Sequence, residues 1–233
     1  MKKILALCVC IISSSIISSC SPIAQGAAAV TTVATMENDR RSMGEILDDK
    51  KLYIDLGNLI SNDSKLDDSH INFNVYNQAV LMTGEAPSEN TRDYIESIVK
   101  SKSTDIKQLI NEVGVMPQSS YLDRAKDGVI SVQVEALFYD QEVFHPRHVS
   151  IHTERGVVYL MGSVTKREAE HATNVASKAK NVKKVVKLFN YLMARPAAEV
   201  ERDNKRKETA EKRAELEAKQ NELNQQLYEL GSD

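Results

Sequence analysis

The stretch Gly156-Val157-Val158-Tyr159-Leu160-Met161-Gly162 is an apolar run of strand length between two glycines. Apolar residues at successive positions, rather than at every second one, are typical of a central strand that helices cover. Glu154-Arg155-Gly156, directly before it, has the composition of a tight turn between antiparallel strands. The run therefore predicts the middle strand of a small sheet.

Upstream of this turn, the pattern predicts another strand and a helix. The strand alternates apolar residues that face inward with polar residues that face outward: Val149 and Ile151 inward, His148, Ser150 and His152 outward. The helix is predicted at Lys126–Gln141, where apolar residues form one stripe at helical spacing: Ile130, Val134, Leu137 and Phe138.

Downstream, a second helix and a third strand complete the unit. Thr165 is followed three residues later by Glu168, which is the capping-box pattern of a helix start. The last strand is predicted at Val182–Leu188. A strand-helix-strand connection is right-handed and makes its two strands parallel. Three strands with two helices on one face predict a two-layer domain of order αββαβ.

The same pattern occurs a second time, 78 residues earlier. The shift superimposes apolar positions of the first helix and of the hairpin: Leu52, Ile54, Leu56, Leu59 and Ile60 on Ile130, Val132, Val134, Leu137 and Phe138, Ile71 and Phe73 on Val149 and Ile151, and Val80, Met82 and Gly84 on Val158, Leu160 and Gly162. After a two-residue gap, the last strands also align: Ile106, Leu109 and Ile110 on Val182, Val185 and Val186. Chance would not hold register through all of these elements, so we infer a duplication.

The predicted fold class is therefore α+β, with two tandem αββαβ domains and a charged C-terminal helix. The first domain is expected at residues 46–114, a linker at 115–124 and the second domain at 125–193. The first helix of the earlier copy is expected at Asp48–Asn62.

The N-terminus carries the pattern of an export signal. Lys2 and Lys3 precede a short apolar run that ends in Ile17-Ser18-Ser19-Cys20, which resembles a bacterial lipobox. In such signals residues 1–19 are removed and the cysteine, here Cys20, carries diacylglycerol and palmitate. Ser21, in place of an aspartate, resembles the outer-membrane address, and residues 20–45 would be a flexible tether. The alternative is a plain secretory signal with an incidental cysteine.

The repeated motifs resemble the BON domain. The second copy carries the resemblance most fully, in Gly156–Gly162, Glu168-Ala169 and Val182, whereas the first has Asn77-Gln78 where a turn glycine is expected. Two such copies behind a lipobox, over about Arg40 to Met193, are similar to the dual-BON outer-membrane lipoproteins of Gram-negative bacteria. The resemblance implies a non-catalytic lipoprotein that binds phospholipid and maintains envelope integrity.

No catalytic, cofactor or metal motif is recognisable, so we expect no enzyme activity, no cofactor and no metal. His148 and His152 would lie roughly 13 Å apart on a strand, too far to share one zinc ion. A site between His145 and His148 stays open beside the interpretation that these histidines are exposed to solvent. The acidic run Asp63, Asp67 and Asp68 lacks the glycine and distal glutamate of an EF-hand and favours a solvated loop.

The two domains differ in charge. Residues 46–114 contain 7 Lys+Arg and 12 Asp+Glu, and residues 125–193 contain 10 Lys+Arg and 7 Asp+Glu. A positive domain near a bilayer is attracted to anionic headgroups, although ordinary surface variation would also produce this difference.

The first helix of the second domain is the expected lipid-binding element. Val129 and Tyr139 lie outside its core stripe, and a wide apolar face can enter a lipid interface. The residues expected to contact anionic phospholipid are Lys126, Val129, Val132, Tyr139 and Arg147. The helix has no large aromatic at its expected start, which weakens the prediction, and its apolar residues could instead pack against the first domain.

Residues 194–233 are rich in Glu, Lys, Ala and Gln and favour a solvated helix, with a disordered tail as the alternative. Acidic residues outnumber basic ones there, so no nucleic-acid partner is expected. The function predicted from these observations is a non-catalytic outer-membrane lipoprotein on the periplasmic face that binds anionic phospholipid. The alternative is a periplasmic adaptor that docks envelope proteins, such as outer-membrane assembly or cell-wall remodelling machinery.

Overall fold

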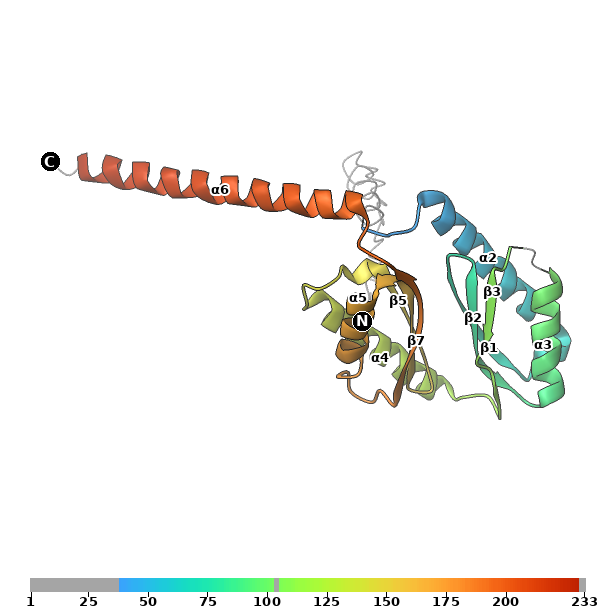
Figure 1. Ribbon diagram of the computed structural model, residues 1–233. Helices are drawn as coiled ribbons and strands as arrows, with labels where there is room; N and C mark the ends of the chain where they lie inside the picture. The colour runs from blue at the N-terminus through green and yellow to red at the C-terminus, as the bar shows by residue number, and fades with distance from the viewer. Residues whose placement is uncertain (1–37, 103–104, 231–233) are drawn as a thin grey trace, which may run out of the picture. The chain divides into compact units, whose positions relative to one another are not determined.

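The computed structural model describes residues 38–102 and 105–230 and confirms an α+β fold with two αββαβ units (Figure 1). The first repeat consists of α2 (Met43–Ser61), the 3-10 turn η1 (Ser64–Leu66), β1 (His70–Tyr76), β2 (Ala79–Ala86), α3 (Glu89–Lys102), β3 (Gln108–Asn111) and β4 (Gly114–Val115). The second consists of α4 (Tyr121–Tyr139), η2 (Pro146–His148), β5 (Val149–Glu154), β6 (Val157–Thr165), α5 (Lys166–Ala176) and β7 (Lys184–Leu192), and is followed by α6 (Ala197–Leu230).

Strand register confirms the duplication. In each repeat the middle strand pairs antiparallel with the strand before it and parallel with the strand after the crossover helix. Val80 pairs with Leu109 in the first repeat, and Val158 pairs with Val185 in the second. These are the positions that the 78-residue shift and its two-residue gap superimpose.

Both first helices begin five residues earlier than predicted, at Met43 instead of Asp48 and at Tyr121 instead of Lys126. The reason is the capping residue. The Oγ atoms of Ser42 and Ser120 accept hydrogen bonds from backbone N–H groups three residues later and so start the helices before the apolar stripe begins. The tail forms one continuous helix, α6, rather than the disordered alternative.

A buried aspartate joins each first helix to the hairpin turn of its own repeat. The Asp127 carboxylate accepts hydrogen bonds from the backbone N–H groups of Arg155 and Gly156, at 2.7 and 2.8 Å. In the first repeat, Asp49 accepts them in the same way from Asn77 and Gln78, at 2.6 and 2.7 Å. All four turn residues have positive φ angles, so the aspartate holds a turn that most residues disfavour.

Replacing Asp127 with alanine should therefore lower the free energy of unfolding by about 3 kcal/mol. The change removes two hydrogen bonds and leaves the buried N–H of Gly156 and the part-buried N–H of Arg155 without that acceptor. The measurement is urea denaturation followed by circular dichroism. Asp123→Ala, four residues away on an exposed part of α4, is the matched control and should cost less than about 1 kcal/mol. Equal effects of the two changes would contradict the assigned role.

Two glycines bring backbones into close contact at corresponding places. A Cβ atom on Gly84, whose φ is +110°, would lie 1.9 Å from the carbonyl oxygen of His70. A Cβ atom on Gly162 would lie 2.2 Å from the carbonyl oxygen of His148. The glycines that end the apolar runs in the sequence are therefore required by the close approach of the neighbouring strand.

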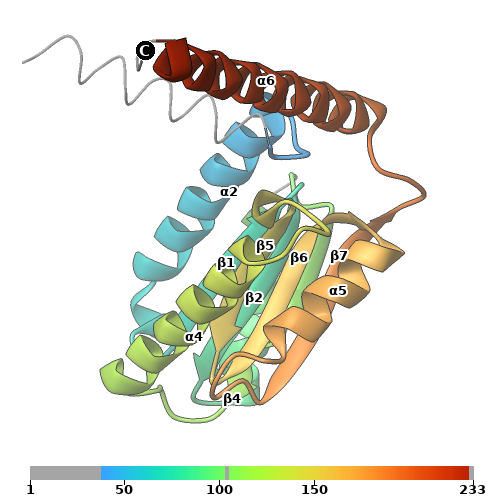
Figure 2. The same ribbon diagram turned by 90° about the vertical axis from the view of Figure 1, so that its left-hand side faces the viewer.

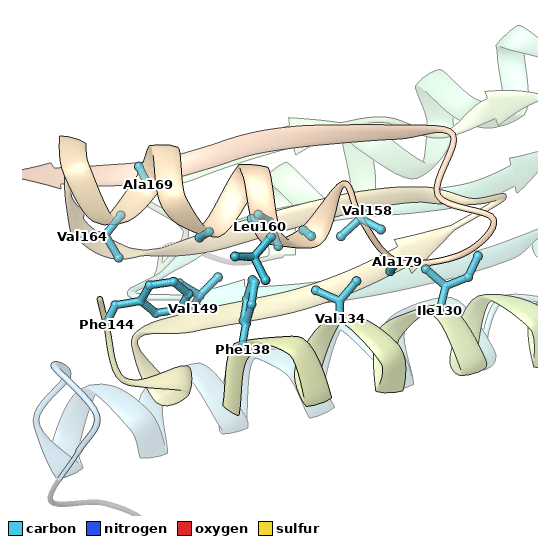
Figure 3. Packing of buried hydrophobic residues seen from close by; sticks show 13 residues of the cluster. Ile130, Val134, Phe138, Phe144, Val149, Val158, Leu160, Val164, Ala169 and Ala179 are labelled. Atoms are coloured by element: carbon cyan, nitrogen blue, oxygen red, sulfur yellow. The ribbon is translucent and has the colours of Figure 1, made fainter. Parts of the chain in front are cut away.

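Each repeat has its own hydrophobic core between its helices and its sheet, and Figure 3 shows the core of the second. There Phe138 packs edge-on against Phe144, with ring centroids 5.0 Å apart. The two middle strands are also buried on the side that faces away from the helices, where four residues form a third cluster: Tyr76, Leu81, Tyr159 and Met161. Figure 2 shows both sheets from the side of the α4 helix. Burial on both faces explains the continuous apolar runs.

The segment before the first repeat is joined to the second repeat and to α6 by buried ion pairs. The Arg40 guanidinium donates hydrogen bonds to the carboxylates of Glu168 and Glu199 and to the Ser163 carbonyl oxygen. We call Arg40, Glu168 and Glu199 the clasp. Their side chains are 4%, 3% and 8% exposed. The prediction of a flexible tether over residues 20–45 is therefore wrong for its last part, because Arg40 is fixed by these partners.

Among the described residues, none of the helices combines the length and the apolar character that a membrane-crossing segment needs.

Candidate functional site

One face of α4 is an exposed apolar stripe. It contains the three apolar residues predicted from the sequence, since Val129, Val132 and Tyr139 are 57%, 67% and 58% exposed. They do not pack into the first repeat, which was the alternative interpretation. The opposite face of the same helix is buried: it places Asp127 at the hairpin turn and supplies Ile130, Val134 and Phe138 to the core.

Two further apolar residues, outside the set predicted from the sequence, extend this stripe to the start of the helix. Tyr121 and Leu122 are 86% and 67% exposed and occupy the first two positions of α4. The Arg124 guanidinium stacks over the Tyr121 ring at 4.7 Å and adds a cation beside it. The sequence signal for these residues is the N-cap Ser120, because a helix that starts directly after it includes Tyr121 and Leu122 in its first turn. The large aromatic that the prediction lacked is therefore present.

Cations lie at both ends of the apolar stripe. Lys126 is exposed and pairs with Asp123 at 2.8 Å, and it lines a hollow of about 800 Å³ to which Arg155 and Lys183 also contribute. Arg147 is exposed and lines a second hollow, of about 250 Å³, together with Tyr139. The five predicted contact residues are thus distributed along α4 and the loop beside its C-terminal end.

The corresponding face of α2 has a different chemistry. Met43, Leu47 and Ile54 are exposed there, at 50%, 59% and 47%. The exposed ion pair between Lys51 and Asp55 lies on the same helix, and Lys51 takes the position that Val129 has in α4. Only the second repeat therefore has an apolar face that is continuous along the helix.

The expectation that the histidines are exposed is wrong for His148. This residue is 2% exposed, and burial together with the Arg40 charge lowers its pKa to about 4. His148 Nδ1 accepts the backbone N–H of His145, and His145 Nδ1 accepts that of Arg147, so both rings cap η2. His152 is partly buried and contacts the Thr83 hydroxyl of the first repeat at 2.7 Å.

Two other predicted features remain, the acidic run around Asp63 and the lipidation residue Cys20. Asp63 caps η1 and accepts a hydrogen bond from the Tyr94 hydroxyl at 2.6 Å, so it has a structural role in its loop. The lipidation residue Cys20 and the export signal lie outside the described residues. Two side-chain clusters within the described part have the composition of a metal site: His70, Glu85 and Glu154, and His148, Glu168 and Glu199. In the second of them, Arg40 bonds to both carboxylates.

Comparisons with known proteins agree with this architecture. The family model of the BON domain matches residues 48–117 and 126–193. The chain is 31% identical to "Outer membrane lipoprotein DolP" of Haemophilus influenzae, over 72% of this chain and 85% of that protein. It is 26% identical to "21 kDa hemolysin" of Actinobacillus pleuropneumoniae, over 66% of this chain and 79% of that protein.

Among solved structures, CdsD, a structural protein of the type III secretion system of Chlamydia trachomatis, overlays 63% of this chain and 65% of its own. The TM-score is 0.25 and the identity 11%, so this overlay carries no further conclusion.

Proposed function

Because this chain belongs to the family of outer-membrane lipoproteins with two BON domains, we propose that its second BON domain binds anionic phospholipid through α4. In this proposal a lipid on Cys20 holds the protein on the periplasmic face of the outer membrane, and lipid binding supports envelope integrity. The protein acts without catalysis. The single observation that carries the proposal is the exposed apolar stripe of α4, from Tyr121 to Tyr139.

The stripe has the properties of a helix that lies in the plane of a lipid interface. Such helices bury an apolar face to a depth of about 5–10 Å and keep polar groups at the headgroups. Tyr121, Leu122, Val132 and Tyr139 supply large apolar groups along the whole helix. The tyrosines suit the interface in particular, since their rings are apolar and their hydroxyl groups stay hydrated.

Electrostatic attraction would add to this insertion. Lys126, Arg155 and Lys183 surround the hollow at the start of α4, and Arg147 lies near its end. Each cation near an anionic surface contributes about 1 kcal/mol. Asp123 pairs with Lys126 and Glu85 pairs with Arg155, which reduces the contribution of both cations, so we propose that apolar contact provides the larger part of the affinity. An anchored chain would also meet headgroups at high effective concentration, so weak contacts would suffice.

Vesicle co-sedimentation tests this function, with the chain from Ser21 onward, which retains every described residue. Binding should rise with phosphatidylglycerol content and fall with salt. Val129→Glu combined with Val132→Glu should weaken binding at least about tenfold, because it replaces two apolar contacts worth roughly 1 kcal/mol each with charges. The measurement is the bound fraction as a function of lipid concentration.

The matched control changes the corresponding face of the first repeat, with Leu47→Glu and Ile54→Glu, which are also exposed positions. The control should bind vesicles as the unchanged protein does. Equal losses in both double variants would contradict a specific role of α4. Absence of binding at high phosphatidylglycerol content and low salt would overturn the lipid proposal.

A second candidate function, that of a protein adaptor, is favoured by α6. This helix has 34 residues and exposes Leu216, Leu223, Leu227 and Tyr228, at 67%, 58%, 64% and 80%. Its remaining exposed surface carries ion pairs one helical turn apart, such as Lys212 with Glu208. An exposed leucine row on a long helix is a surface that partner helices can use. If vesicles do not bind, envelope proteins that dock on α6 become the better explanation.

A further inference from the structure

A polar cluster lies where the two repeats meet. His70 comes from β1, Glu85 from β2 and Glu154 from β5, at the end of the hairpin in the second repeat. His70 Nδ1 lies 3.2 Å from Glu85 Oε2, and one ligand atom from each of the three residues lies within 4.8 Å of the other two. Glu85 is fully buried, Glu154 is 6% exposed and the His70 side chain is 16% exposed. The cluster is thus buried, with its histidine at the rim.

The cluster contains two carboxylates but has a cation on only one of them. Arg155 Nη1 pairs with Glu85 Oε1 at 2.8 Å, from a side chain that is 44% exposed. Glu154 receives hydrogen bonds from neutral groups, Asn72 Nδ2 at 2.9 Å and Thr83 Oγ1 at 3.4 Å. Within residues 38–102 and 105–230, no ion pair reaches Glu154. A buried carboxylate beside another one is costly unless a cation or a proton neutralises it.

The second repeat contains a corresponding cluster in which a cation contacts both carboxylates. His148 corresponds to His70 under the 78-residue shift, and it also lies beside two buried carboxylates, those of Glu168 and Glu199. There the Arg40 guanidinium donates hydrogen bonds to both carboxylates at once. At His70 the chain provides no such bridging cation among the described residues.

We propose that the cluster of His70, Glu85 and Glu154 binds one Zn²⁺ ion between the two repeats. The donor set is one imidazole nitrogen and two carboxylate oxygens, which suits zinc, whereas calcium and magnesium prefer oxygen ligands alone. The 3.2 Å separation of His70 Nδ1 from Glu85 Oε2 matches the edge of a zinc tetrahedron, about 3.3 Å for bonds of about 2.0 Å. Glu154 completes the site with a small movement of its carboxylate, because one ligand atom from each of the three residues already lies within 4.8 Å of the other two, and water takes the fourth position.

Groups around the cluster orient the proposed ligands. The Ser119 backbone N–H and hydroxyl both donate to Glu85 Oε2 at 3.2 Å, and Asn72 fixes Glu154. Such outer hydrogen bonds hold metal ligands in place. Because His70 and Glu85 belong to the first repeat and Glu154 to the second, the ion would link the repeats. Zinc would thereby stabilise the arrangement in which the two sheets share their apolar cluster.

The test is isothermal titration of the full chain, purified in detergent and freed of metal with EDTA, with ZnCl₂ at pH 7.5. We expect one equivalent to bind with a Kd of about 10 µM or tighter, and the melting temperature to rise with zinc concentration. Loss of an outer hydrogen-bond partner typically weakens metal binding about 10–100-fold, so loss of a ligand in Glu154→Gln should cost at least about 100-fold. MgCl₂ and CaCl₂ should give no comparable binding.

His145→Gln is the matched control, since it removes an accessible histidine outside the cluster, and it should bind zinc normally. His70→Gln gives the same test from the rim of the site if Glu154→Gln does not fold. No binding at 1:1 stoichiometry by the unchanged chain would overturn the proposal. Binding that neither cluster variant weakens, or that His145→Gln weakens equally, would also overturn it and identify adventitious surface binding.

Discussion

Replacing Arg40 with alanine should lower the free energy of unfolding by about 3–5 kcal/mol, the range expected when one partner of a buried ion pair is removed. Arg40 is the only residue of the clasp with a positive charge, and its five hydrogen bonds reach Glu168, Glu199 and Ser163. Without it, Glu168 stays buried beside Glu199 and loses its cation. Urea denaturation followed by circular dichroism measures the change.

The control for this prediction is Lys51→Ala. Lys51 also makes an ion pair, with Asp55, but both side chains are exposed, at 71% and 55%. Exposed pairs contribute little, so the control should change stability by less than about 0.5 kcal/mol. A loss below about 1 kcal/mol in Arg40→Ala would contradict the importance of the clasp.

The clasp also predicts a response to acid. Burial opposes ionisation of Glu199, but hydrogen bonds from Arg40 and Arg195 outweigh it and lower the pKa to about 2. Because this pKa lies below that of an unfolded glutamate, the stabilisation is complete above about pH 4.5 and is lost as the pH falls towards 2. Stability measured across this window should fall less steeply in Arg40→Ala than in the unchanged protein.

The second large effect is expected for Gly84→Ala. The new Cβ would lie 1.9 Å from a backbone oxygen, and alanine disfavours a φ of +110°. Since backbone on both strands must move, we expect a loss of about 4 kcal/mol or more and a fall in melting temperature of about 10 °C or more. Thermal unfolding followed by circular dichroism is the measurement.

Gly57→Ala is the control for this glycine. It lies inside α2, and a Cβ there meets nothing within 4 Å. Alanine favours a helix interior, so this change should stabilise the protein by up to about 1 kcal/mol. If the Gly84→Ala protein were as stable as the unchanged chain, the close approach of the two strands at Gly84 would not contribute to stability, and the prediction would be wrong.

The fold could be predicted from the sequence because its signals are local and occur twice. Apolar runs, helical stripes and turn residues repeat after 78 residues, and register in one copy supports register in the other. The exposed residues Val129, Val132 and Tyr139 could also be predicted from a local signal, because they are apolar residues of the helix that lie outside its core stripe.

The missed features depend on contacts between distant residues or on a capping residue. Tyr121 and Leu122 were missed because Ser120 starts the helix before its apolar pattern becomes visible. Arg40 meets Glu199 across 159 residues, and Thr83 meets His152 across 69. No periodicity encodes such pairs. The sequence pattern therefore predicts which strand positions are polar. Which of these polar side chains meet, and that they are buried, depends on the fold.

The clasp has a mechanical consequence. Arg40 precedes the first repeat and Glu199 follows the second, so the ion pair closes nearly the whole folded region into a non-covalent ring. A pulling force between the N-terminal segment and α6 would load this pair directly, before any strand is peeled from a sheet. Arg195 also donates two hydrogen bonds to the Glu199 carboxylate. Under such a load the clasp would break first, and the two β-sheets would stay intact until it had opened.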